Sequence, residues 1–198
     1  MKIICYIIII LLILLVTGCL ISFNEPILDS FEQEYSKSGL NILTPLEIWE
    51  KQFGSASVIP QKDGGHTYFY WPKKGIAVFT HPHYEAQYRR KERSKRKVTS
   101  IIIPLKKTIK PRIVPVEDDL IISFDQLTNL EINGHRITNM SLSEIKNLYR
   151  FTKKSDNFIE MSNFPIISLA PILTTVYIDN NEPTQIEIEI NRLFDWYD

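Results

Sequence analysis

Both cysteines of this chain lie within its first 19 residues, so the remainder must fold without a disulfide bond. Lys2 gives the N-terminus a positive charge, and the run from Ile3 to Val16 is uncharged and almost entirely apolar. This run is shorter than the roughly 20 residues that a membrane-spanning helix needs, and its length is typical of a signal-peptide core. We therefore predict a signal peptide over residues 1–18, which would remove Cys5 from the mature chain.

Small residues lead into the second cysteine, in the order Val16-Thr17-Gly18-Cys19. This motif resembles the lipobox of bacterial lipoproteins, in which the cysteine is acylated and becomes the first residue of the mature protein. The resemblance implies a lipid anchor at Cys19 and a place in the cell envelope, facing the periplasm. Leu20 stands where an aspartate would favour retention at the inner membrane, so the resemblance favours the outer membrane. An uncleaved anchor that continues through Phe23 is the alternative.

Without a disulfide, the rest of the chain needs a hydrophobic core, and its composition allows one. Hydrophobic residues make up 44% of the chain and aromatic residues 11%. Lys and Arg total 23, as do Asp and Glu, so no overall charge excess points to a nucleic-acid partner. We predict a tether with one short helix over residues 19–40 and an α+β domain over residues 41–198.

Two capping boxes predict helix starts. Thr44-Pro45-Leu46-Glu47 and Ser141-Leu142-Ser143-Glu144 each place a hydroxyl group at the N-cap and a glutamate three residues later. Apolar residues at helical spacing follow both boxes. A weaker pattern of the same kind over Ile27–Tyr35 predicts the short helix of the tether, with Gly39 as its stop.

Strands are predicted where apolar and β-branched residues gather between turn signals. They are Tyr68–Trp71, Ile76–Phe79, Val98–Leu105, Leu120–Phe124, Thr174–Ile178 and Gln185–Ile190. The last of these alternates isoleucine with Glu187 and Glu189, which predicts a strand with one solvated face. Gly75 and the pair Asn133-Gly134 are hairpin turn signals.

The order of these elements predicts the fold class α+β, with an antiparallel sheet built from two diverged helix-then-hairpin units. The units span residues 42–106 and 130–191, and the two capping boxes take corresponding places in them. Ordinary α+β patterning that occurs twice by chance is the alternative.

Residues 84–97 have the highest density of charged side chains in the sequence. Their only acidic residues are Glu85 and Glu92. The basic residues are Arg89, Arg90, Lys91, Arg93, Lys95, Arg96 and Lys97. Like charges this close repel one another and cannot be buried unpaired, so we predict an exposed loop. One interpretation is contact with an anionic surface, such as lipid headgroups or lipopolysaccharide phosphates. The other is a solubilising loop without a partner.

Two further groups of residues are candidate sites. Tyr68, Tyr70 and Trp71 form an interface if one face of their strand is exposed, because Tyr and Trp are favoured interface residues. The alternative is that both faces are covered. His81 and His83 suggest a metal pair, but no third ligand has a recognisable spacing, so a metal-dependent hydrolase is the weakest hypothesis. We predict no catalytic residue, no metal and no cofactor, since no known catalytic motif occurs.

The run Tyr68-x-Tyr70-Trp71-x-x-x-Gly75-Ile76, after a helix that ends at Phe53-Gly54, resembles a module of uncharacterised bacterial proteins. Some of these are encoded beside secreted toxins as immunity partners. The doubled helix-plus-sheet layout is also similar to that of tandem β-lactamase-inhibitor proteins and small outer-membrane lipoproteins. The resemblance implies a non-enzymatic envelope lipoprotein that binds another protein. The alternative function is structural, with contact to lipid or lipopolysaccharide through residues 89–97.

Overall fold

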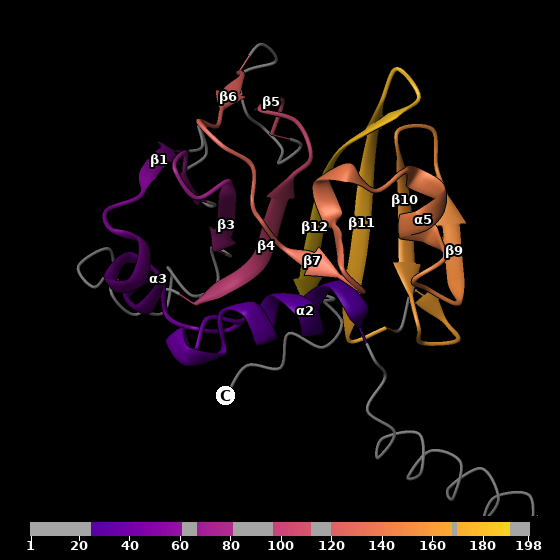
Figure 1. The fold of residues 1–198 in the computed structure, drawn as a ribbon, viewed down its shortest axis with the longest axis horizontal. Helices are drawn as coiled ribbons and strands as arrows, with labels where there is room; N and C mark the ends of the chain where they lie inside the picture. Colours follow the sequence, from indigo (N-terminus) through magenta and orange to yellow (C-terminus); the bar gives the residue numbers. More distant parts are fainter. Residues whose placement is uncertain (1–24, 61–66, 81–96, 112–119, 168–169, 191–198) are drawn as a thin grey trace, which may run out of the picture.

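The computed structural model describes residues 25–60, 67–80, 97–111, 120–167 and 170–190. Within these ranges the main sheet contains β1 (Ser57–Pro60), β2 (Thr67–Trp71), β3 (Ile76–Thr80), β4 (Val98–Pro104), β9 (Phe151–Lys154), β10 (Phe158–Ser162), β11 (Ile172–Asp179) and β12 (Glu182–Ile190). Their order across the sheet is β1-β2-β3-β4-β12-β11-β10-β9, and every neighbouring pair is antiparallel (Figure 1). The predicted class, α+β with an antiparallel sheet, is confirmed.

The two halves of the sheet meet at its centre, where β4 pairs with β12. Ile103 lies opposite Ile186 in this pair, and both side chains are buried. Beyond the end of β4, the backbone N–H of Leu105 donates a hydrogen bond to the carbonyl oxygen of Thr184 at 2.9 Å. In the first half of the sheet, the strands β1 to β4 therefore lie side by side in the order in which they occur in the sequence. The strands β9 to β12 of the second half do the same, starting from the opposite edge of the sheet.

Helices and a small hairpin cover one face of the sheet (Figure 1). They are α2 (Pro26–Glu34), η1 (Ser36–Ser38), α3 (Leu46–Phe53), η3 (Ile137–Asn139) and α5 (Leu142–Lys146), with the strands β7 (Glu131–Ile132) and β8 (His135–Arg136). The main core lies between this layer and the sheet. At its centre Trp49 stacks on Phe31 and on Trp71, with ring centroids 5.7 and 6.1 Å apart.

The short helix predicted in the tether is present as α2 and belongs to the folded domain. Its residues Ile27, Leu28 and Phe31 are buried in the main core. Burial of three large apolar side chains fixes this segment to the sheet. The part of the predicted tether that forms α2 is therefore packed on the domain.

A second, smaller core lies on the opposite face of the sheet and covers only the β1–β4 half. Its cover is the hairpin formed by β5 (Thr108–Ile109) and β6 (Ile122–Ser123). The buried residues of this cluster are Tyr68, Ala77, Phe79, Ile102, Ile109, Ile122 and Phe124. Each face of the first half is therefore covered by a different part of the chain.

After β6 the chain crosses to the helix-covered face around the turn between β2 and β3. The backbone N–H of Asp125 donates a hydrogen bond to the carbonyl oxygen of Pro72 at 3.1 Å. Gly75, in the same turn, has φ +63°, and a Cβ placed on it would lie 2.5 Å from the backbone nitrogen of Thr128. Glycine is required here both by the left-handed backbone and by the close approach of the crossing segment.

The two predicted capping boxes have different outcomes. The box at the start of α5 is confirmed, since Ser141 Oγ accepts a hydrogen bond from the backbone N–H of Glu144 at 3.3 Å, and the backbone N–H of Ser141 donates one to Glu144 Oε2 at 2.7 Å. The box at Thr44 is wrong, although the helix itself, α3, is present. Pro45 is the N-cap, without a side-chain cap, and Thr44 Oγ1 instead accepts a hydrogen bond from the backbone N–H of Asn41 at 3.1 Å.

Candidate functional site

Most of the predicted site residues lie outside the described part of the chain. This applies to Cys19, to His81 and His83, and to the basic residues from Arg89 to Arg96. Lys97 is described: it is exposed and forms an isolated antiparallel bridge with Pro45, next to the start of β4. The anchor and the anionic-surface contact therefore stay predictions.

The three aromatic residues predicted as an interface do not share an exposed surface. Tyr68 is 2% exposed in the smaller core, and Trp71 is 3% exposed in the main core. Trp71 Nε1 donates a hydrogen bond to the carbonyl oxygen of Gly54 at 2.7 Å. Successive residues of β2 point to opposite faces, and each face is covered, so the alternative of two covered faces describes this strand. Tyr70 alone of the three is half-buried, with its ring 6.1 Å from that of Phe124.

Another surface, on the second half of the sheet, is a better candidate for recognition. It comprises Phe151, Lys153, Phe158, Glu160 and Tyr177, and we refer to it as the outer-strand surface. The register places Lys153 opposite Glu160 and Phe158 opposite Tyr177 on β9, β10 and β11. The alternate residues of β10 point into the main core, so the outer-strand surface lies on the face opposite the helices.

The side chains of this surface combine aromatic rings with a charged pair. The rings of Phe158 and Tyr177 have centroids 6.1 Å apart, and Lys153 Nζ lies 3.0 Å from Glu160 Oε2. Phe151 is 36% exposed, on a terminal strand whose residues are all exposed. Tyr and Phe with a polar rim are the composition that protein interfaces favour.

A buried carboxylate supports the aromatic part of the surface. The hydroxyl of Tyr177 donates a hydrogen bond to Glu187 Oε2 at 2.9 Å. Glu187 is only 6% exposed, which corrects the expectation that the glutamates of β12 line a solvated face. Its place next to the central strand β4, opposite Ile102, explains the burial.

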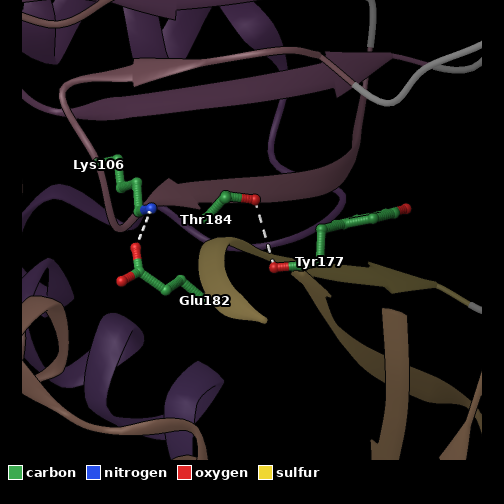
Figure 2. Close-up of polar contacts among 4 residues, drawn as sticks. All are labelled: Lys106, Tyr177, Glu182 and Thr184. Atoms are coloured by element: carbon green, nitrogen blue, oxygen red, sulfur yellow. Dashed lines mark hydrogen bonds and ion pairs between the residues drawn. The ribbon is translucent and has the colours of Figure 1, made fainter. Parts of the chain in front are cut away.

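Polar contacts at the β11–β12 hairpin fix the backbone of Tyr177. The register of the hairpin shifts after Tyr177, and there the hydroxyl of Thr184 donates a hydrogen bond to the Tyr177 carbonyl oxygen at 3.3 Å. Lys106 Nζ lies 2.5 Å from Glu182 Oε2 and connects the hairpin to the end of β4. Figure 2 shows the ring of Tyr177 extending away from these contacts.

The sequence holds one signal for this surface that the strand predictions omit. In Phe158–Ser162, aromatic and charged residues alternate with Ile159 and Met161, which is the pattern of a half-buried strand. The neighbouring strand β9 has no such alternation, because none of its residues is buried.

Within the described ranges, no three His, Cys, Asp or Glu side chains come together in a group that could bind a metal ion. No described helix has the length and apolar character needed to cross a bilayer. A scan of family models, a search of curated proteins and a search of solved structures find no match for this chain.

Proposed function

We propose that this chain is a non-enzymatic, lipid-anchored protein of the cell envelope that binds another protein through the outer-strand surface. The observation that carries the proposal is Phe151, an exposed aromatic side chain on a terminal strand, on the same face of the sheet as Phe158 and Tyr177. Aromatic anchors supply most of the energy of protein interfaces, and the Lys153–Glu160 pair gives this one a polar rim. Among the described strands β9 has a neighbour on one side only, and its other backbone edge would offer the partner a place to add a strand.

We also propose that the sheet consists of two diverged units, over residues 42–106 and 130–191. α3 precedes β1–β4 in the same way as α5 precedes β9–β12, and the last strands of the two series pair with each other. In the first unit the β5–β6 hairpin covers the face opposite the helices. The outer-strand surface is the corresponding place in the second unit, and the partner would provide its cover.

The proposed lipid anchor and the outer-strand surface together indicate the compartment in which the partner would bind. A lipid at Cys19 would hold the domain at the envelope, facing the periplasm, with the outer membrane favoured. The partner is a protein that reaches this compartment, and a secreted toxin bound by an immunity-type protein fits that description. The alternative function is contact with lipid or lipopolysaccharide through residues 89–97.

Site-specific photo-crosslinking in living cells tests the binding surface. Phe151 is replaced by the photoreactive analogue benzoylphenylalanine in the full chain, and the same replacement is made at Val58. The two positions form a matched pair, because both lie on terminal strands and their side chains are 36% and 40% exposed. We expect irradiation to give a discrete protein adduct from position 151 and none from position 58.

The adducts are identified by mass spectrometry after purification of the chain. An adduct of position 151 with lipid or lipopolysaccharide and none with a protein would contradict the proposed protein-binding surface. Absence of any adduct from position 151, or the same adduct from both positions, would contradict the proposed surface. In a Lys153→Glu background we expect less of the protein adduct, because the reversed charge repels Glu160 and disturbs the rim.

A further inference from the structure

A buried carboxyl group holds the start of α2 against the end of β10. Glu25 immediately precedes α2, and its side chain is 6% exposed. Ser162 Oγ donates a hydrogen bond to Glu25 Oε1 at 3.3 Å, and the backbone N–H of Asn163 donates another to the same carboxyl group. Glu25 Oε2 has no hydrogen-bond partner within the part of the chain that the structure describes. The carboxyl group is therefore buried with only part of its hydrogen-bonding capacity used.

The described groups that face this carboxyl, apart from its donors Ser162 and Asn163, carry no positive charge. Asp29 lies one turn further along α2, and its negative charge opposes ionisation of Glu25. Tyr149 faces Glu25 from the segment after α5, but its hydroxyl donates to Thr174 Oγ1 on β11 at 2.9 Å. Burial is the main cause that raises the pKa of Glu25 to about 7, from an ordinary value of 4.5.

α2 connects this contact to the main core. Ile27 and Leu28, in its first turn, are buried, and the ring of Phe31 stacks on Trp49. Figure 1 shows α2 lying across the end of the sheet where β4 begins and β12 ends. An ionised carboxylate at the start of α2 would have to recover water, because burial of an unpaired charge is costly. Movement of the first turn of α2 away from β10 would admit this water.

We infer that Glu25 is a proton-controlled latch, which holds the first turn of α2 against β10 while its carboxyl is protonated and releases this turn when the carboxyl ionises. For a carboxyl group whose pKa is raised on folding, the attachment is complete below about pH 4.5 and is lost as the pH rises through about 7. Release exposes Ile27 and Leu28. The latch shares no residue with the outer-strand surface, so each proposal can be tested independently of the other.

Hydrogen–deuterium exchange of α2, measured by mass spectrometry on the full chain in detergent micelles, tests the latch. After correction for intrinsic exchange rates, we expect the protection of α2 to fall on the order of 100-fold between about pH 5 and pH 8. The β11–β12 hairpin should keep its protection. Glu25→Gln should remove the pH dependence of α2, whereas Glu34→Gln, an exposed position on the same helix, should leave it unchanged.

A wild-type profile without pH dependence, or a fall in protection that persists in Glu25→Gln, would overturn the inference. A second measurement covers the case in which that variant does not fold. The carbon-13 shift of the Glu25 side-chain carboxyl can be titrated in the wild-type protein. A midpoint near pH 7 supports the latch, and a midpoint below about 5 contradicts it.

Discussion

Gly75→Ala is expected to lower the free energy of unfolding by about 3–5 kcal/mol, as is typical when backbone strain and overpacking combine. The new Cβ would lie 2.5 Å from the nitrogen of Thr128 and 2.6 Å from the carbonyl oxygen of Gln126. Both are backbone atoms, so neither can move without displacing the segment that crosses from one face of the sheet to the other. Urea-induced unfolding measures the loss.

Gly39→Ala is the matched control, because Gly39 has nearly the same backbone conformation and different surroundings. Its φ is +65°, and within the described part of the chain no heavy atom beyond its two chain neighbours lies within 4 Å of an added Cβ. This variant should lose only the roughly 1–2 kcal/mol that a left-handed conformation costs an alanine. Equal losses for the two variants would show that the crossing segment does not pack on the β2–β3 turn.

Trp49→Ala should be nearly as damaging, with an expected loss of about 3–5 kcal/mol for a large aromatic side chain removed from a core. Trp49 is fully buried and connects three elements, since its ring contacts Phe31 of α2, Phe53 of α3 and Trp71 of β2. The cavity would separate α2 and α3 from the sheet. Far-ultraviolet circular dichroism follows the unfolding, because the variant lacks this tryptophan.

Trp49→Phe separates the packing of this ring from its polar group. Trp49 Nε1 is buried and has no hydrogen-bond partner in the described part of the chain. Phenylalanine keeps much of the apolar volume and removes the unsatisfied N–H. The Trp49→Phe variant should therefore lose less than about 1.5 kcal/mol of unfolding free energy. A loss as large as that of Trp49→Ala would mean that the indole N–H makes a stabilising contact.

The sequence predicts those elements whose signals are local. Asn133-Gly134 has the positive φ angles of a tight hairpin turn, and it joins β7 to β8. The capping box at Ser141 is local in the same sense. At Thr44 the local signal fails because a distant strand competes for the segment: the backbone N–H of Val98 donates to the Thr44 carbonyl oxygen at 3.1 Å.

The outer-strand surface could be predicted only in part, because β10 has the alternation of a half-buried strand and β9 has no strand signal of its own. β9 is exposed at all four positions and shows no alternation, so only its pairing with β10 identifies it as a strand. The order of the sheet is non-local, because β4 and β12 lie side by side although they are distant in the sequence. The burial of Tyr68 and Trp71 follows from this order, because it decides which segments cover each face.

The most direct test of the central claim is the mass of the N-terminal peptide of the chain, purified from the membrane fraction of a bacterial host. If the chain is a lipid-anchored envelope protein, its N-terminal peptide should begin at Cys19 and carry acyl chains. A Cys19→Ser variant should lose both the cleavage and the lipid. A chain that retains residues 1–18, or one in which Cys19 is an unmodified thiol, would contradict the account.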